Sequence, residues 1–243
     1  MKTALITGAS CGIGRACAIK LSEDGYAVVI NYSKNDEKAE ETAKIITDNG
    51  GNATVYKANV TDLAQVKKMM NDVAKTNGGI DVLVNNAGVV KDGYLLTVPS
   101  ETLDECINLN VKGYYYCAQQ AALKMFRKKS GIIINMSSVS SILALEGQSV
   151  YAATKGAVNA LTSTLAKELA PMGIRVNAVA PGFVETDMLN SIPEEKKKEY
   201  LKAIPMKRFC KAEEVADVVS ALCSDAFGYV TGQIIVLDGG LSL

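Results

Sequence analysis

Short apolar runs alternate with longer amphipathic stretches along the chain. The apolar runs predict strands at residues 4–6, 27–30, 53–56, 82–84, 132–134, 176–180 and 234–237. Strands separated by helical stretches are typical of βαβ units, in which neighbouring strands run parallel and right-handed crossovers place helices on both faces. The pattern therefore predicts an α/β fold: a single Rossmann-type doubly wound domain over residues 1–243, with a seven-stranded parallel sheet.

The amphipathic stretches predict the helices between these strands. They cover residues 12–24, 37–48, from a cap at Thr61 or Asp62 to 76, 103–126, 150–169 and 212–222. Residues 183–205 lack a strand pattern and hold a short charged helix between Pro193 and Pro205. Ligands of such sheets collect outside the carboxyl ends of the strands, so we expect this irregular segment to be a mobile substrate lid.

Composition narrows the classes of partner. Basic and acidic residues number 26 each, so the net charge is zero and no basic tract favours nucleic acid or an anionic membrane. The N-terminus shows no signal-peptide pattern, and the six cysteines form no Cys-x-x-Cys pair. We expect a cytoplasmic protein with reduced thiols and without a metal site, a nucleic-acid partner or a membrane anchor.

The chain contains no histidine. This excludes every catalytic triad or metal site that depends on imidazole, and it removes the commonest general acid and base at neutral pH. Acid–base chemistry in this protein must therefore use tyrosine, lysine, cysteine or a carboxylate.

A glycine-rich turn joins the first predicted strand to the first helix, with the sequence TGASCGIG at residues 7–14. Glycines allow a sharp turn and a close approach of the backbone to a pyrophosphate, which the helix N-terminus attracts. The spacing is not the common G-x-G-x-x-G, and a tight turn that binds nothing is the alternative. The position between a strand and a helix favours dinucleotide binding.

The end of the second predicted strand bears on the choice of dinucleotide. An acidic residue there would bind the adenosine ribose and exclude a 2′-phosphate, but the strand ends in Asn31-Tyr32-Ser33-Lys34, without a carboxylate. Asn31, Ser33 and Lys34 could donate hydrogen bonds to a phosphate. We therefore expect NADP(H) as cofactor, with NAD(H) as the alternative.

Tyr151 and Lys155 lie four residues apart at the start of a predicted helix, and so on one face of it. An ammonium ~4 Å from a phenol contributes up to ~4 kcal/mol at an effective dielectric constant near 20, enough to lower the pKa of the phenol by two or three units. Such a pair replaces the missing imidazole as an acid–base couple. Ser138, just past the fifth strand, could hold a substrate oxygen beside the phenol, although such serines are also common loop caps.

Taken together, these motifs resemble the short-chain dehydrogenase/reductase family. The resemblance covers essentially the whole chain and rests on TGASCGIG at 7–14, NNAG at 85–88, SS at 137–138, YAATK at 151–155 and PG at 181–182. Within the family, the chain most resembles the 3-oxoacyl-[acyl-carrier-protein] reductases. The resemblance implies NADPH-dependent reduction of a 3-oxoacyl thioester in fatty acid biosynthesis. Acetoacetyl-coenzyme A or another small ketone or alcohol is the alternative substrate, and a non-catalytic dinucleotide sensor is a further alternative.

The resemblance also implies roles for individual residues. Tyr151 would protonate the carbonyl oxygen, Lys155 would lower the pKa of Tyr151 and bind the nicotinamide ribose, and Ser138 would orient the carbonyl. Asn110 would hold a water that connects Lys155 to solvent, with Asn108 as the nearby competitor for this role.

The implied cofactor contacts extend over the whole carboxyl edge of the sheet. They are Gly8, Ser10, Gly12, Ile13, Gly14, Asn31, Tyr32, Ser33, Asn59, Val60, Asn86, Ala87, Gly88, Tyr151, Lys155, Pro181, Gly182, Val184 and Thr186. Asn59 and Val60 would contact adenine, and residues 86–88 would line the adenosine ribose as well as stabilise the end of a strand.

The partners follow from the same resemblance. The substrate would be linked to acyl carrier protein or to coenzyme A, and Arg127, Lys128 and Lys129 could meet an acidic carrier near the pocket. Met172 stands where a second basic residue is typical, which leaves the coenzyme A alternative open. The apolar surface of the two long helices, 103–126 and 150–169, together with the resemblance, suggests a homotetramer.

Overall fold

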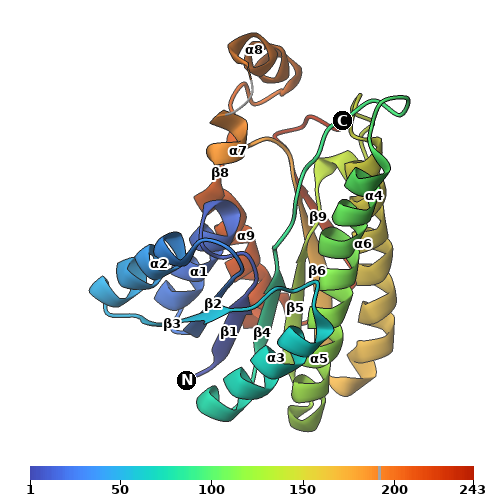
Figure 1. Cartoon of the computed structure of the whole chain (residues 1–243). Helices are drawn as coiled ribbons and strands as arrows, with labels where there is room; N and C mark the ends of the chain where they lie inside the picture. Colours follow the sequence, from blue (N-terminus) through green and yellow to red (C-terminus); the bar gives the residue numbers. More distant parts are fainter. Residues whose placement is uncertain (191–192) are drawn as a thin grey trace.

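Seven parallel strands form the central sheet, in the spatial order β3-β2-β1-β4-β5-β6-β9 (Figure 1). The computed structural model describes residues 1–190 and 193–243. The strands of this sheet are β1 (Thr3–Ile6), β2 (Ala27–Tyr32), β3 (Asn52–Lys57), β4 (Val82–Asn85), β5 (Gly131–Met136), β6 (Ile174–Pro181) and β9 (Ile234–Leu237). Each registered pair in it is parallel, so the predicted Rossmann-type sheet is confirmed.

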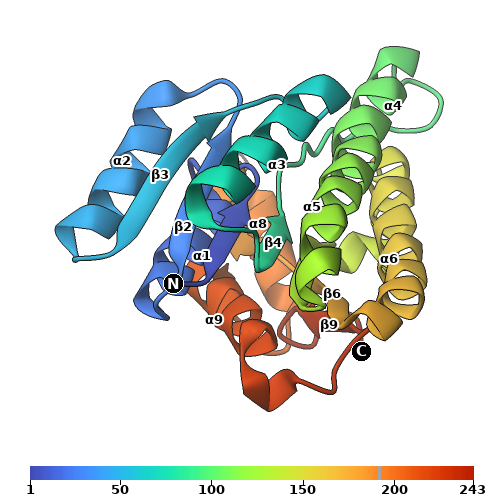
Figure 2. The same ribbon diagram turned by 90° about the horizontal axis from the view of Figure 1, so that it is seen from below.

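Helices cover both faces of the sheet, and β1 shows how the sequence divides its side chains between them. Ala4 and Ile6 are buried in one apolar core, and Leu5 between them is buried in the other, as the alternation of a strand requires. Figure 2 shows α3 and α5 on one side of the sheet and α1 and α9 on the other. The helices are α1 (Gly12–Glu23), α2 (Asp36–Asp48), α3 (Leu63–Asn77), α4 (Ser100–Ile107), α5 (Tyr114–Lys128), α6 (Ser149–Leu169), α7 (Asp187–Asn190), α8 (Glu194–Ala203) and α9 (Ala212–Cys223).

The predicted continuous helix over residues 103–126 is wrong in its middle. The structure has α4, then a π-helix at Asn108–Gly113, then α5. An amphipathic pattern shows which positions are apolar, but it does not show the one extra residue per turn that makes a π-helix. Such π turns occur frequently at functional sites.

The segment 183–205 also contains more structure than its pattern indicates. A two-residue strand β7 (Val184–Glu185) pairs in parallel with β8 (Cys210–Lys211), and the charged helix appears as α8. The Phe183 ring stacks on Tyr200 with 4.1 Å between centroids, which attaches α8 to the start of the segment. Residues 191–192 of the expected lid lie outside the described residues.

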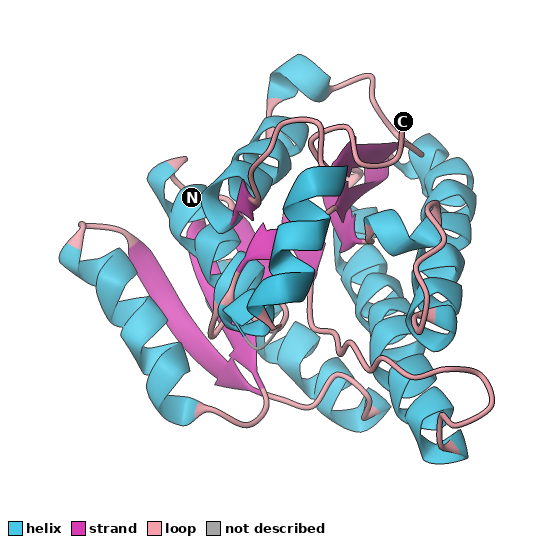
Figure 3. Ribbon diagram, turned by 90° about the horizontal axis from the view of Figure 1, so that it is seen from above, coloured by secondary structure: helices cyan, strands magenta, loops and turns pink. Residues whose placement is uncertain are grey.

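The sheet order reverses between β1 and β4, which are hydrogen-bonded neighbours. In doubly wound sheets, ligands bind at such a switch point, outside the carboxyl ends of the strands. Figure 3 views the molecule from above, with helices on either side of the strands. Within the described residues, no helix is long and apolar enough to cross a membrane.

Candidate active site

The glycine turn after β1 is shaped to bring backbone close to a ligand. Gly8 and Gly12 have positive φ values of 63° and 54°, which glycine adopts at little cost. A Cβ on Gly14 would clash with the carbonyl oxygen of Gly8 and lie 2.5 Å from Nδ2 of Asn86. Helix α1 then begins at Gly12, and the side chain of its N-cap, Cys11, makes no capping hydrogen bond. The first N–H groups of α1 are therefore free to bind an anion such as a pyrophosphate.

Asn86, just after β4, fixes this turn from the neighbouring strand. Its Nδ2 donates to the carbonyl oxygens of Thr7 at 3.0 Å and Gly8 at 3.1 Å. The Thr7 hydroxyl in turn accepts from the backbone N–H groups of Asn86 and Ala87. The expected structural role of residues 86–88 is confirmed, while their contact with an adenosine ribose remains a prediction.

A cavity of about 1160 Å³ opens along the carboxyl edge of the sheet. It is larger than the ~300–1,000 Å³ of typical small-molecule sites, so it has room for a dinucleotide and a substrate together. Ser138 and every implied cofactor contact except Gly14 line it, and Asn110 does not reach it. With the glycine cradle and the free helix N-terminus, the residues present fit a nicotinamide dinucleotide.

The cavity is also lined by residues that the sequence did not single out. They include Val89, Asp92, Leu145, Phe183, Asp187 and Leu189. None lies in a recognisable motif. All follow the ends of β4, β5 or β6, and this position after a strand is the sequence signal that could have identified them.

Asn31 does not act as the phosphate donor that the sequence suggested. Its side chain is buried, and Nδ2 donates to the carbonyl oxygens of Ala58 at 3.0 Å and Tyr56 at 3.2 Å. These bonds hold β2 to β3, so the amide hydrogens are already used. Ser33 and Lys34 line the cavity and are exposed, and they remain the candidate phosphate donors at this edge.

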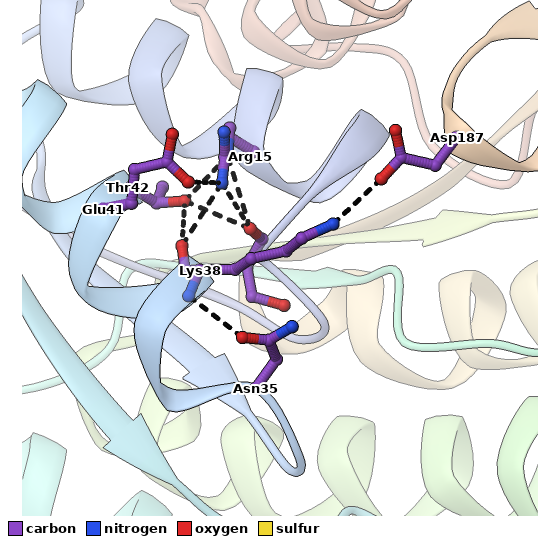
Figure 4. Close-up of polar contacts among 7 residues, drawn as sticks. Arg15, Asn35, Lys38, Glu41, Thr42 and Asp187 are labelled. Carbon is purple, nitrogen blue, oxygen red and sulfur yellow. Dashed lines mark hydrogen bonds and ion pairs between the residues drawn. The ribbon is translucent and has the colours of Figure 1, made fainter.

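A polar network joins α1, α2 and α7 at the mouth of the cavity (Figure 4). Arg15 donates to Ser10 O at 3.0 Å, to Thr42 Oγ1 at 2.9 Å and to Glu41 Oε2 at 2.8 Å. Next to it, Lys38 Nζ reaches across to Asp187 Oδ2 at 3.0 Å. The guanidinium of Arg15 is thus engaged by hydrogen bonds to the glycine turn and to α2, whereas Lys38 links α2 to α7.

The three expected catalytic side chains meet at this cavity, from two neighbouring segments. Ser138 follows β5, and Tyr151 and Lys155 lie one helical turn apart on α6. The Ser138 hydroxyl accepts from the N–H of Ser140 at 3.2 Å, and a hydrogen bond from Ser138 favours the ionised form of the Tyr151 phenol. A serine hydroxyl beside a phenol can orient a carbonyl oxygen for proton transfer.

The expected lowering of the Tyr151 pKa by Lys155 is not what the structure gives. Burial raises the pKa of Tyr151 to about 12, and it lowers the pKa of Lys155 to about 7. The Lys155 ammonium lies 5.7 Å from the centre of the Tyr151 ring and donates to Met136 O at 2.6 Å. Burial favours the neutral form of both groups, so at neutral pH the phenol keeps its proton and can act as an acid.

The structure separates Asn110 from its competitor Asn108. Asn110 is fully buried in the π-helix, where Oδ1 accepts from Val89 N and Nδ2 donates to Val89 O, both at 2.9 Å. Asn108 is half-buried, lines the cavity and accepts from the exposed Lys112. Asn110 therefore supports the loop after β4 beside Lys155, and the water that it was expected to hold remains a prediction.

The basic residues expected near the pocket lie at the opposite end of the sheet. Arg127 and Lys128 end α5, and Lys128 pairs with Asp81, which precedes β4. That is the amino edge of the strands, whereas the cavity is at the carboxyl edge. Residues 127–129 of one chain cannot meet a carrier at the mouth of the same chain's cavity, because a parallel sheet separates the two edges by the length of its strands.

Comparison with known proteins places these features among reductases. The family model described as enoyl-(acyl carrier protein) reductase matches residues 8–242. The chain is 44% identical over 240 residues to the 3-oxoacyl-[acyl-carrier-protein] reductase FabG of Staphylococcus aureus, covering 99% of this chain and 98% of that protein. FabG of Thermotoga maritima is also 44% identical, with 99% and 97% covered. The crystal structure of gox2181 matches with a TM-score of 0.96 at 29% identity, over 99% of this chain and 95% of that one.

Proposed function

Because this chain belongs to the short-chain dehydrogenase/reductase family, we propose that it reduces 3-oxoacyl thioesters on acyl carrier protein to 3-hydroxyacyl thioesters in fatty acid biosynthesis, with NADPH as the reductant. The observation that carries the proposal is the meeting of Ser138, Tyr151 and Lys155 at one cavity large enough for cofactor and substrate. The names of the curated relatives supply the substrate class.

The chemistry divides between the cofactor and the chain. The nicotinamide, when bound, supplies a hydride to the carbonyl carbon. Tyr151 gives its proton to the carbonyl oxygen, and Ser138 donates a hydrogen bond to the same oxygen as charge develops on it. Lys155 stabilises the phenolate that remains and binds the ribose beside it. The glycine turn and the N-terminus of α1 hold the pyrophosphate.

NADP(H) is favoured over NAD(H) by the polar end of β2. No carboxylate stands there to repel a 2′-phosphate, and Ser33 and Lys34 line the cavity. NADPH and NADH titrated side by side test this preference. A clear preference for NADH would contradict it.

A homotetramer is supported by apolar side chains left exposed on α4 and α5. They are Leu103, Ile107, Tyr115, Leu123 and Phe126, each at least 38% exposed. Exposed apolar side chains that gather on consecutive helices are typical of a subunit interface. Light scattering that gives a monomer at micromolar concentration would contradict the tetramer.

We further propose that the protein works in the cytoplasm and that the segment 183–205 closes over the substrate.

A substrate panel tests the proposed reaction. NADPH consumption is followed with acetoacetyl and crotonyl thioesters, each on acyl carrier protein and on coenzyme A, and with small ketones. The proposal expects fastest turnover of acetoacetyl-carrier protein. The crotonyl thioester is included because the matching family model is described as an enoyl reductase. Preference for coenzyme A or for a free ketone would favour the alternative substrate class.

Tyr151→Phe separates catalysis from binding, because it keeps the ring and removes the proton. Turnover is expected to fall by about 10²–10⁴-fold, the usual contribution of a general acid. NADPH binding, followed by fluorescence, is expected to persist. Tyr229→Phe is the matched control, since Tyr229 is fully exposed. A Tyr151→Phe variant that retains most of its turnover refutes the assigned role, and a wild-type protein that binds NADPH without any turnover favours a sensor.

A further inference from the structure

Tyr114 is a buried polar residue that the proposed reaction does not use. It is the first residue of α5, directly after the π-helix, and its side chain is among the largest fully buried ones, at 1% exposure. A phenol in such a place needs a hydrogen-bond partner for its hydroxyl group. Its partners are the carbonyl oxygen of Met136 at the end of β5 and the ammonium of Lys155.

These three groups form a closed triangle of hydrogen bonds. The Tyr114 hydroxyl donates to Met136 O at 3.1 Å and accepts from Lys155 Nζ at 3.3 Å. Lys155 Nζ also donates to Met136 O at 2.6 Å. An ammonium has three hydrogens, so two of them are directed toward the sheet by Met136 and Tyr114.

Lys155 also reaches the cavity. Lys155 lines the cavity together with Tyr151 and Gly88. A Cβ added to Gly88 would lie 3.2 Å from Asn110 Oδ1 and 3.9 Å from Nζ, so Nζ lies close to this part of the cavity lining. The ammonium also lies between two phenol rings, 5.0 Å from the Tyr114 centroid and 5.7 Å from that of Tyr151.

We propose that Tyr114 is a positioning residue for Lys155: its hydroxyl accepts one ammonium hydrogen and, together with the Met136 carbonyl, directs the third hydrogen into the cavity. The proposal rests on the role given to Lys155 under the proposed function. The Tyr114 hydroxyl is suited to this task because it donates to Met136 and presents its lone pair to the lysine. Phenylalanine at this place would keep the ring and lose the acceptor.

The contact also stabilises the charged form of Lys155. Burial holds the pKa of this lysine near 7, and each acceptor on the ammonium opposes that shift. The other titratable groups around the cluster are Tyr114 and Cys117 on α5, Tyr151 on α6, Cys106 on α4 and Asp92 after β4. Burial raises the pKa values of both tyrosines and both cysteines, so a proton lost from this cluster between pH 6 and 8 comes from Lys155.

Tyr114→Phe in the full-length protein tests the proposal. The variant is expected to fold, because Met136 O keeps Lys155 as a donor and no buried polar atom is left alone. With one acceptor fewer, the ammonium is less stable, and the Lys155 pKa is expected to fall by about one unit. The alkaline limb of the kcat profile is expected to move to lower pH by the same amount, with kcat at pH 7.5 reduced several-fold and KM for NADPH little changed.

A direct titration keeps this test independent of the substrate. Protein carrying [ε-¹³C]lysine is titrated by NMR, and the Lys155 signal is identified by its loss in Lys155→Met. Tyr229→Phe, at a fully exposed tyrosine, is the matched control. Urea unfolding of each variant reports the stability separately.

The outcomes are distinct. A lower Lys155 pKa in Tyr114→Phe, with no change in Tyr229→Phe, supports the positioning role even if the thioester panel fails. A Tyr114→Phe variant that only unfolds more easily, with the Lys155 titration and the kcat limb unmoved, overturns it and makes Tyr114 a core residue alone.

Discussion

Nδ2 of Asn110 donates to the Thr154 hydroxyl at 3.1 Å, which ties the π-helix to α6 one residue before Lys155. The same side chain binds both backbone groups of Val89. One buried amide thus joins the loop after β4, the π-helix and the helix that carries the proposed acid.

Asn110→Ala is therefore expected to lose both stability and turnover. It leaves the partly buried N–H and C=O of Val89 without their partner, so we expect a loss of about 1–3 kcal/mol in the free energy of unfolding measured in urea. Asn71→Ala is the control, because Asn71 is exposed on α3 and accepts a hydrogen bond from Lys124 away from the cavity, and it is expected to leave stability and turnover unchanged. Equal effects in the two variants would contradict the assignment.

An added methyl group is expected to change stability in opposite directions at two glycines, Gly14 and Gly156. In Gly14→Ala the new Cβ meets Gly8 O and Asn86 Nδ2, so we expect a loss of about 1–3 kcal/mol and weaker NADPH binding. In Gly156→Ala the Cβ meets nothing within 4 Å in the interior of α6, so stability is expected to rise by about 0.5–1 kcal/mol. Thermal unfolding and NADPH fluorescence measure both. A harmless Gly14→Ala would remove the argument for a tight cradle.

The lowered pKa of Lys155 predicts that the free energy of unfolding depends on pH. Its pKa is about 7 when folded and near 10.4 when unfolded, so between these values the unfolded chain holds a proton that the folded one has lost. The unfolded state then binds more protons, and the free energy of unfolding rises with pH above 7. Urea unfolding is measured from pH 7 to about 7.8, below the pKa of ~8.5 at which thiols of the unfolded chain ionise. Lys155→Met should flatten this rise, and an identical slope in both proteins would place the lysine pKa elsewhere.

The exposed ion pair between Lys38 and Asp187 predicts an effect on cofactor exchange rather than on stability. Asp187→Asn releases α7 from α2 at the cavity mouth, so NADPH is expected to dissociate roughly two- to fivefold faster in stopped-flow fluorescence, with the urea midpoint unchanged. High salt should reduce the difference, because it screens the wild-type pair. Asp48→Asn breaks a similar pair with Lys44 within α2 and is expected to change nothing. Unchanged dissociation in Asp187→Asn would show that the pair does not control the entrance.

Several elements were predictable because their signals are local. The apolar runs 4–6 and 82–84 became β1 and β4, and a charged stretch between two prolines became α8. The glycine turn and the Tyr151–Lys155 spacing each lie within one turn or one helix, so their geometry follows from a few neighbouring residues. The π turn at Asn108–Gly113 was missed because it depends on one inserted residue that leaves the apolar pattern intact.

Site residues that depend on distant partners were not predictable in the same way. Asn31 looked like a phosphate donor but binds carbonyl groups of residues 56 and 58, and Tyr114 resembled its exposed neighbour Tyr115. Residues 127–129 looked like a carrier contact until the sheet placed them at its other edge. Sequence spacing does not report which polar atoms another strand will satisfy.

By itself, the sequence determined a parallel α/β sheet and a tyrosine and a lysine one helical turn apart in a chain without histidine. These follow from the periods of strands and helices and from the residue types available. Only the tertiary structure decided that this ammonium is desolvated between two phenol rings and that the Tyr151 phenol keeps its proton. Those properties come from burial and from the hydrogen bonds of Lys155 to Met136 and Tyr114, which lie 19 and 41 residues away along the chain. Tertiary packing creates these contacts, and no local sequence pattern encodes them.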